Sequence, residues 1–311
     1  MSSYRIGRPF CKQVFELQRH INDISLARIV KCGYREPVLQ RRSIGTRALI
    51  TGASSGVGAE FARQLAAAGL DLVLVARNAA RLEAFADELR SAHDVEVEVL
   101  PADLLTKAGV KAAEARVGAS VGRIDVLVNN AGFGLARDFD RNSVDDELEL
   151  LTMLVEVPLR LTHAALAHML PAGSGTIINI ASVAGFTPRG TYSAAKAWLL
   201  TFSRWANVAY RRRGVRITAI APGFVRTEFH QRLATDAHAA VAADEVARPT
   251  QLERAVPDFM WLAAPDVVRA ALIDTMRGRA VSIPSLRYKL IVALARLTPD
   301  ALAERVARVG R

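Results

Sequence analysis

From Arg47 onward, short apolar runs alternate with longer segments in which apolar side chains recur at helical spacing. The first helical segment, Glu60–Ala68, is rich in Ala and Leu and is followed by Gly69, a typical helix terminator. Short continuous apolar runs predict buried strands, and Val95–Leu100 alternates apolar and acidic residues as a strand near a sheet edge does. The predicted strands are Ala48–Ile50, Leu72–Ala76, Val95–Leu100, Ile124–Val128, Thr176–Ile180, Val215–Ile220 and Ala280–Ile283.

Strands that alternate with helices in this way indicate right-handed crossovers and a parallel sheet covered on both faces. We therefore predict an α/β fold, a Rossmann-type doubly wound parallel sheet of about seven strands in a three-layer αβα sandwich. Ligands of such sheets bind beyond the carboxyl ends of the strands. The residues that follow the strands are therefore the candidates for function.

Basic residues are concentrated at the two ends of the chain. The net charge is +10 over 311 residues. Residues 1–45 carry nine Lys/Arg and three Asp/Glu, and residues 284–311 carry six and two, which leaves the segment between them neutral. A nucleic-acid enzyme would carry its basic surface around its site, so we expect no nucleic-acid partner. We predict a basic N-terminal extension (1–45), a Rossmann-fold domain (46–285) and a basic, apolar C-terminal tail (286–311).

Cysteine and histidine usage gives no pattern of a metal site. Cys11 and Cys32 are expected to be reduced thiols, with a disulfide between them as the alternative. The six histidines lack metal-ligand spacing, so we predict no metal. No uncharged apolar run reaches the roughly 18 residues of a membrane span, and the N-terminus lacks the pattern of a secretory signal. We expect a cytoplasmic protein.

A glycine-rich turn, Thr51-Gly52-Ala53-Ser54-Ser55-Gly56-Val57-Gly58, directly follows the first predicted strand. Gly52 permits a tight turn, Gly56 lets the backbone approach a pyrophosphate, and Gly58 lets the helix pack closely on the strand. The N-terminus of the next helix would present free N–H groups and a partial positive charge to phosphates. Between a first strand and a first helix, this turn indicates a dinucleotide site.

The residues after the second and third strands bear on which dinucleotide is bound. A carboxylate after the second strand would bind a ribose 2′-OH and favour NAD, but the sequence there is Val75-Ala76-Arg77-Asn78. Arg77 is placed to meet a 2′-phosphate, which favours NADP(H); a solvated surface arginine is the alternative. Asp103, just after the third strand, is placed either to bond the adenine amino group or to cap a helix.

Five motifs occur in the order typical of the short-chain dehydrogenase/reductase family, which the chain resembles over residues 46–285. They are the turn Thr51–Gly58, Asn129-Asn130-Ala131-Gly132 after the fourth strand, Ser182 after the fifth, Tyr192-x-x-x-Lys196, and Pro222-Gly223 after the sixth. The resemblance implies an NADP(H)-dependent oxidoreductase and a homo-oligomer.

The resemblance also assigns cofactor contacts. The backbone of Asn130-Ala131-Gly132 would pack against the adenine ribose, and Pro222-Gly223 would form a wall beside the nicotinamide. Thr227 would bond the carboxamide or a phosphate, with a helix cap as the alternative. The expected contacts are Gly52, Ser54, Ser55, Gly56, Val57, Gly58, Arg77, Asp103, Leu104, Asn130, Ala131, Gly132, Tyr192, Lys196, Pro222, Gly223 and Thr227.

Residue chemistry supports Ser182, Tyr192 and Lys196 as the catalytic set. Tyr192 and Lys196 are four residues apart and therefore share one face of a helix. A tyrosine with its ordinary pKa of about 10 is a poor acid or base at neutral pH. The neighbouring ammonium and an oxidised nicotinamide both favour phenolate, so we expect the pKa of Tyr192 to be lowered. Ser182 would stabilise charge on a carbonyl oxygen, and in reduction Tyr192 would protonate that oxygen. Lys196 would also hold the nicotinamide ribose, as the resemblance implies.

One position departs from the family's pattern. The family places a fourth catalytic residue, an asparagine that holds a water linking the lysine to solvent, in the helix between the fourth and fifth strands. Alignment on Arg160-Leu161-Thr162-His163 puts Leu154 there, and no asparagine occurs from Ser143 to Ile178. Either other groups rebuild the relay, with Thr152 and Glu156 nearest in sequence, or the protein is mainly an NADP-binding regulatory or scaffold protein with weak turnover. The intact catalytic set favours the first interpretation.

Residues 224–275 are expected to form a lobe over the substrate. An apolar or lipid-like carbonyl compound fits this lobe better than a sugar, with ordinary core or a subunit contact as the alternative. Its apolar side chains include Phe224, Phe229, Leu233, Val256, Phe259, Met260 and Trp261. Val256–Trp261 and the tail are also similar to actinobacterial members of the family thought to reduce long-chain keto-acyl lipids.

Both ends of the chain contain apolar helical patterns among basic residues. Val14, Leu17, Ile21 and Ile24 recur at helical spacing, and Leu286–Leu297 is an apolar stretch with basic side chains. Such helices could lie on an anionic membrane or contact an acidic partner such as an acyl carrier or coenzyme A. Packing of the tail on its own domain or on another subunit is the alternative. Residues 1–45 have no counterpart in the family core, which leaves an ordered appendage, a disordered leader and an artefact of the chosen start codon as interpretations.

Overall fold

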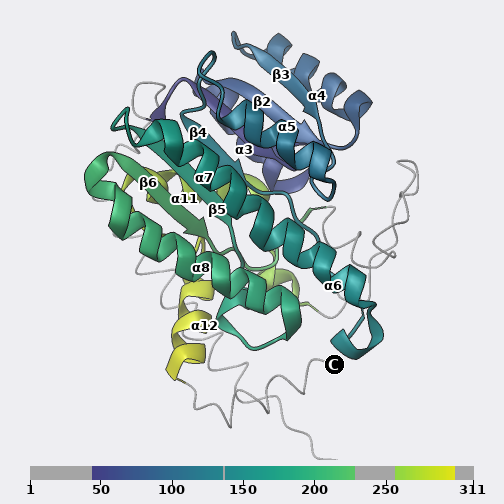
Figure 1. The fold of residues 1–311 in the computed structure, drawn as a ribbon. Coiled ribbons are helices and arrows are strands. Elements are labelled where there is room, and N and C mark those ends of the chain that lie inside the picture. Colours follow the sequence, from purple (N-terminus) through teal and green to yellow (C-terminus); the bar gives the residue numbers. More distant parts are fainter. Residues whose placement is uncertain (1–43, 136, 228–255, 298–311) are drawn as a thin grey trace, which may run out of the picture. The chain divides into compact units, whose positions relative to one another are not determined.

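The computed structural model describes residues 44–135, 137–227 and 256–297. In this part of the chain, seven parallel strands form one sheet in the order β3-β2-β1-β4-β5-β6-β7 (Figure 1). The strands are β1 (Arg47–Thr51), β2 (Asp71–Ala76), β3 (Val97–Pro101), β4 (Val126–Asn129), β5 (Gly175–Ile180), β6 (Val215–Ile220) and β7 (Val281–Ser282). The strand order reverses between β1 and β4, which places the crevice for a ligand at their carboxyl ends.

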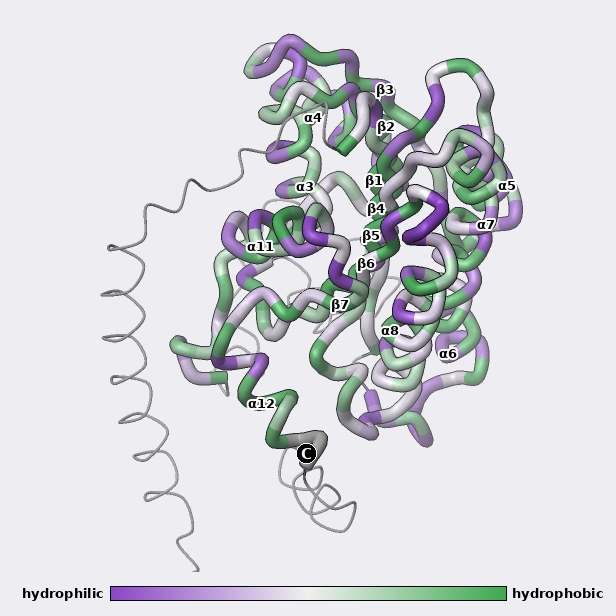
Figure 2. The backbone as a smooth tube through the Cα atoms, turned by 90° about the vertical axis from the view of Figure 1, so that its left-hand side faces the viewer, coloured by the Kyte–Doolittle hydropathy of each residue, from purple (hydrophilic) through white to green (hydrophobic). Residues whose placement is uncertain are grey.

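Helices cover both faces of the sheet, as Figure 2 shows from the edge. The α-helices are α3 (Gly56–Ala67), α4 (Ala79–Ala92), α5 (Lys107–Val117), α6 (Val144–Leu151), α7 (Val157–Met169), α8 (Gly190–Tyr210), α11 (Ala264–Met276) and α12 (Leu286–Leu297). Single turns of 3-10 helix occur at η1 (Phe139–Arg141), η3 (Val183–Phe186), η4 (Arg211–Arg213) and η5 (Asp258–Met260), and η2 (Thr152–Glu156) is a π-helix.

The alternation of side chains along each strand divides the core into two layers. Ile50 of β1 packs in one buried cluster with Phe61 of α3 and Leu272 of α11. Leu49, its neighbour, points to the other face and packs in a second cluster with Leu161 of α7. Because successive strand residues point to opposite faces, runs of consecutive apolar residues are required, as the sequence shows. The predicted Rossmann-type αβα sandwich is confirmed.

Element boundaries differ from the sequence expectation at a few places. β3 and β4 each begin two residues later than predicted, because Val95 bonds back to the carbonyl of His93 and the carboxylate of Asp125 turns to bind Thr46. β7 is only two residues long, since Pro284 follows almost at once. Helix α3 begins at Gly56 rather than Glu60, so the glycine turn itself forms its first turn.

The continuous helical stretch Val144–Met169, which comprises α6, η2 and α7, is long and apolar enough to cross a membrane by composition. Its side chains Leu154, Leu161 and Met169 are fully buried in the core cluster on one face of the sheet. The core helix of a globular domain meets the same test, so the stretch is weak evidence for a membrane span.

Several sequence predictions concern residues outside the described ranges. The residues outside these ranges include nearly all of the N-terminal extension with both cysteines, the middle of the expected substrate lobe (228–255) and the end of the tail (298–311). The division of the chain into extension, domain and tail therefore stays a prediction.

Candidate active site

Tyr192 and Lys196 lie on the first turns of α8, at the carboxyl end of the sheet. The helix begins at Gly190, whose φ of 67° turns the chain sharply into it. A second glycine, Gly185 in η3, lets that segment approach the helix: a Cβ there would lie 2.8 Å from the backbone carbon of Lys196. This close approach brings the segment after β5, which contains Ser182, against the start of α8.

Ser182 and Tyr192 are joined by a side-chain hydrogen bond. The Ser182 Oγ also accepts a hydrogen bond of 3.1 Å from the backbone N–H of Ala184, which fixes its rotamer at the start of η3. Lys196 is buried, and its Nζ donates a hydrogen bond of 2.7 Å to the carbonyl of Ile180 at the end of β5. The Nζ lies 5.6 Å from the centre of the Tyr192 ring. The structure thus brings the three predicted catalytic side chains together.

Desolvation dominates the electrostatics of this set. It raises the pKa of Tyr192 to about 12, against the opposing effect of the bond with Ser182. It lowers the pKa of Lys196 from its ordinary value of 10.5 to about 8. The expected lowering of the tyrosine pKa is therefore not produced by the protein's own groups, because Lys196 points its ammonium at a backbone carbonyl. At neutral pH the phenol is therefore protonated, and its proton can leave only when a nearby positive charge stabilises the phenolate.

Leu154, the residue aligned with the family's asparagine, lies against Gly132. It is fully buried within the π-helix η2. A Cβ built on Gly132 would lie 3.0 Å from the Leu154 Cδ2 and 4.0 Å from the Lys196 Nζ, so Leu154 and Lys196 both lie close to this glycine. Of the two substitutes considered for the missing relay, Glu156 bonds Arg160 at 2.8 Å on the exposed side of the helix and is removed as a candidate. Thr152 remains one.

The glycine turn has the geometry of a phosphate cradle. Gly52 and Gly56 have φ values of 65° and 56°, which side-chain-bearing residues rarely adopt. A Cβ on Gly58 would lie 2.3 Å from the Gly52 carbonyl oxygen, so the helix packs on the strand as predicted. The first N–H groups of α3 have no acceptor within the helix and point out of its N-terminus. These features fit a pyrophosphate bound by backbone amides.

Asn130 has a structural task that the sequence analysis missed. Its side-chain amide donates to the carbonyls of Thr51 (2.9 Å) and Gly52 (3.1 Å), and its backbone N–H bonds the Thr51 hydroxyl at 2.9 Å. The end of β4 is thereby tied to the glycine turn. The structure also contains a buried amide chain from Asn129 to Asn179 (2.8 Å) and on to Ser203 (2.9 Å), whose only signal in the sequence is a polar residue inside two apolar strands.

The other predicted cofactor residues surround the same edge. Arg77 is exposed after β2 and forms no ion pair with another described residue. Thr106, rather than Asp103, caps α5 by accepting from Gly109, while the Asp103 carboxylate accepts from the N–H of Leu105. Leu104 is buried in the core, so only its backbone could face a ligand.

The loop after β6 closes the site. The side chain of Thr227 lies against Gly56, where a Cβ would be 3.2 Å from the Thr227 Cβ. The Pro222 carbonyl accepts a hydrogen bond of 3.0 Å from the N–H of Val183, next to Ser182. The loop after β6 therefore contacts both the phosphate cradle and the segment that carries Ser182.

The model of the short-chain dehydrogenase family matches residues 46–238, which is more than half of the chain. The chain belongs to this family. The family match includes the glycine turn, Ser182, Tyr192 and Lys196, and it confirms the resemblance inferred from the motifs.

Relatives of this dehydrogenase include proteins named for ketone and 3-oxoacyl substrates. A short-chain dehydrogenase from Sphingobium yanoikuyae, solved in complex with NADPH, is 33% identical, with a TM-score of 0.69 over 81% of this chain and 94% of that one. The bulky-bulky ketone specific alcohol dehydrogenase from Comamonas testosteroni is 30% identical, with a TM-score of 0.67 over 82% and 93%. The 3-oxoacyl-(acyl-carrier-protein) reductase FabG of Aquifex aeolicus is 32% identical over 59% of this chain and 75% of that one.

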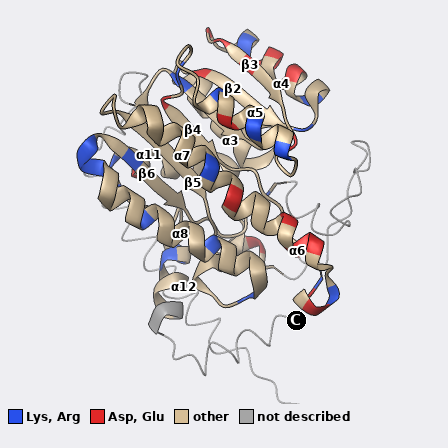
Figure 3. Ribbon diagram, in the orientation of Figure 1, with Lys and Arg blue, Asp and Glu red and all other residues tan. Residues whose placement is uncertain are grey.

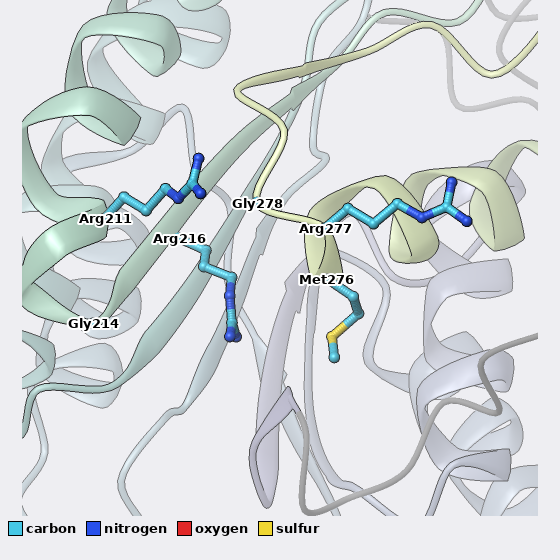
Figure 4. A pocket seen from close by; sticks show the side chains of 6 residues that line it. All are labelled: Arg211, Gly214, Arg216, Met276, Arg277 and Gly278. Carbon is cyan, nitrogen blue, oxygen red and sulfur yellow. The ribbon is translucent and has the colours of Figure 1, made fainter.

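The dehydrogenase also has an arginine-lined hollow at the opposite, amino-terminal end of the strands. It has a volume of about 250 Å³ and lies at the amino end of β6, away from Tyr192. Three of the six residues that line it are Arg211, Arg216 and Arg277, and their guanidinium groups spread in different directions rather than converging (Figure 4). In Figure 3 the ribbon is coloured for basic residues at this end of α8 and for acidic residues along α6. Among the described residues, no three His, Cys, Asp or Glu side chains group as metal ligands.

Proposed function

We propose that this protein is an NADP(H)-dependent reductase of ketones. The observation that carries the proposal is the half-buried phenol of Tyr192 at the carboxyl ends of the strands, hydrogen-bonded to Ser182 and with the Lys196 Nζ 5.6 Å from its ring centre. Reduction of a ketone requires a proton donor and a hydroxyl that stabilises negative charge, both hydrogen-bonded to the carbonyl oxygen of the substrate. The family's oxidoreductase chemistry supports the same reaction.

The cofactor is NADP(H), which supplies the hydride when bound. The cradle of Gly52, Gly56 and the α3 N-terminus would hold its pyrophosphate, and Arg77 its 2′-phosphate. The absence of a carboxylate at the end of β2 and the NADPH complex of the Sphingobium relative support the assignment.

Each catalytic side chain has one task. Ser182 donates a hydrogen bond to the substrate carbonyl oxygen as negative charge develops there. Tyr192 would give its phenolic proton to that oxygen, so that a ketone reduced by hydride from NADP(H) would become a secondary alcohol. Lys196, protonated below its pKa of about 8, stabilises the phenolate that remains.

We propose an apolar ketone, such as a keto-acyl thioester, as the substrate. Phe224 and Trp261 pack with ring centres 5.6 Å apart beside the loop after β6, and Phe259 nearby is half exposed. Their position next to Pro222-Gly223 supports an apolar wall over the substrate. The names of the ketone-specific and 3-oxoacyl relatives agree with this class.

The ends and surfaces of the chain add proposals about partners. On α12, apolar side chains are exposed close to the basic residues Arg287 and Lys289; they are Leu286, Leu290, Ile291 and Leu294. This surface supports peripheral contact with an anionic membrane or with an acyl carrier. The rest of the protein we propose to be cytoplasmic. The exposed Leu159, Trp205 and Val208 on α7 and α8 support a homo-oligomer.

A second candidate is a regulatory NADP-binding protein with weak turnover, favoured by the apolar Leu154 that lies, like the Lys196 ammonium, close to Gly132. Loss of NADPH absorbance with bulky ketones and keto-acyl thioesters separates the two. Turnover that Tyr192→Phe abolishes and Tyr210→Phe, a matched change on the same helix, preserves would establish the reductase. Tight NADPH binding with no turnover on any ketone would favour the regulatory protein.

A further inference from the structure

The C-terminal helix α12 reaches the active-site loop through a single tyrosine. Tyr288 is 2% exposed although its helix neighbours are largely at the surface. Its ring lies directly on Gly223: a Cβ at that glycine would be 1.9 Å from the Tyr288 Cζ and 2.1 Å from its Cε2. Any side chain at position 223 would displace the ring, so the two residues require each other.

The hydroxyl of Tyr288 hydrogen-bonds the same loop and one further backbone segment. It accepts a hydrogen bond of 3.1 Å from the N–H of Phe224 and donates one of 2.8 Å to the carbonyl of Met260 in η5. Burial raises the pKa of Tyr288, which keeps the phenol protonated and able to donate. The Tyr288 side chain therefore ties the loop after β6 to η5 through two part-buried hydrogen bonds.

This loop faces both halves of the candidate site. Pro222 bonds Val183, the residue after Ser182, and Thr227 lies against Gly56 of the phosphate cradle. Tyr288 belongs to a small apolar cluster against which Val183 and Val57 pack. A shift of the tyrosine would therefore move the segment between the cradle and the catalytic serine.

We propose that Tyr288 is a positioning residue that holds Gly223 and Phe224 at the depth required by the nicotinamide half of NADP(H). The inference rests on the proposed function. In this proposal, the C-terminal helix α12 influences cofactor binding through the backbone of Gly223 and Phe224. Tyr288 itself does not contact the reacting atoms.

The test compares two ligands on purified, full-length protein. Tyr288→Phe keeps the ring and removes both hydrogen bonds. Its Kd for NADPH should increase about tenfold, the loss expected for one to two hydrogen bonds, while its Kd for 2′,5′-ADP, which lacks the nicotinamide half, should change less than about twofold. In the ligand-free protein, hydrogen exchange of the Phe224 amide should become faster, because its acceptor is gone.

Leu290→Ala, on the half-exposed side of the same helix, is the matched control and should leave both affinities and the exchange rate unchanged. A merely structural role for Tyr288 would lower the melting temperature and leave the ratio of the two affinities as in wild type, which would overturn the proposal. Gly223→Ala provides the converse: it should weaken NADPH binding, and less so in a Tyr288→Ala background, where the added methyl group has room. Wild-type protein that binds neither ligand would overturn the proposed function itself.

Discussion

The buried lysine of the active site makes stability depend on pH in a way that one substitution isolates. Lys196 is 5% exposed, and desolvation lowers its pKa from 10.5 to about 8. Below about pH 8 the folded and unfolded chains both carry the protonated lysine, so the full cost of burying its charge is present. At about 1.36 kcal/mol per pKa unit, this cost is about 3 kcal/mol.

The cost disappears as the pH rises from the folded pKa to the unfolded one. In this range the folded chain has released the proton and the unfolded chain still holds it, so stability increases with pH. Lys196→Met removes the titrating group and also the 2.7 Å hydrogen bond to the Ile180 carbonyl, a loss of about 1–3 kcal/mol that hardly varies with pH. The stability of the variant relative to wild type should therefore fall by about 2 kcal/mol between about pH 7 and about pH 9.5.

Urea unfolding of the ligand-free proteins at both pH values, followed by tryptophan fluorescence, measures this difference. Lys111→Met, which removes an exposed charge from α5, is the control for the loss of a lysine as such. A difference between Lys196→Met and wild type that stays constant over the two pH values would refute the reasoning, because it would mean that the lysine is charged to the same extent in both states.

Three further predictions follow from contacts around the site. Leu154→Asn, which places an amide beside Lys196, should raise kcat at neutral pH if the missing relay limits turnover, and an unchanged kcat would argue against that account. Arg77→Glu should raise the KM for NADPH about 100-fold, corresponding to about 3 kcal/mol of charge-assisted bonds, with little change for NADH; equal changes for both cofactors would contradict the 2′-phosphate contact. Gly58→Ala forces a Cβ to 2.3 Å from a backbone oxygen and should lower stability by about 2–4 kcal/mol in thermal unfolding. Gly118→Ala, where the nearest atom is 3.4 Å away, should be tolerated, and similar losses in both would exclude the packing explanation.

The positions of most strands along the chain and the glycine turn could be predicted because they depend on short stretches of sequence. Consecutive apolar residues fit a strand buried on both faces, so β1, β5 and β6 were located within one or two residues. Positive φ values at Gly52 and Gly56 are a local requirement of the turn. Strand starts were predicted less well at β3 and β4, since pairing with a neighbour, and not hydropathy, decides where a strand begins.

The sequence by itself determined the fold class, the family, the phosphate cradle and the pairing of Tyr192 with Lys196 on one helix face, because each follows from spacing within a few residues. Only the tertiary structure decided which groups surround them. In the folded chain, Lys196 donates its hydrogen bond to Ile180, and Glu156 lies at the surface. Tyr288 packs on Gly223, which is 65 positions away in sequence. Such contacts depend on how the helices pack on the sheet, and this packing is determined by all core side chains together. The pKa values of the site follow from the same cause, since burial is a property of the assembled fold and not of the neighbours in sequence.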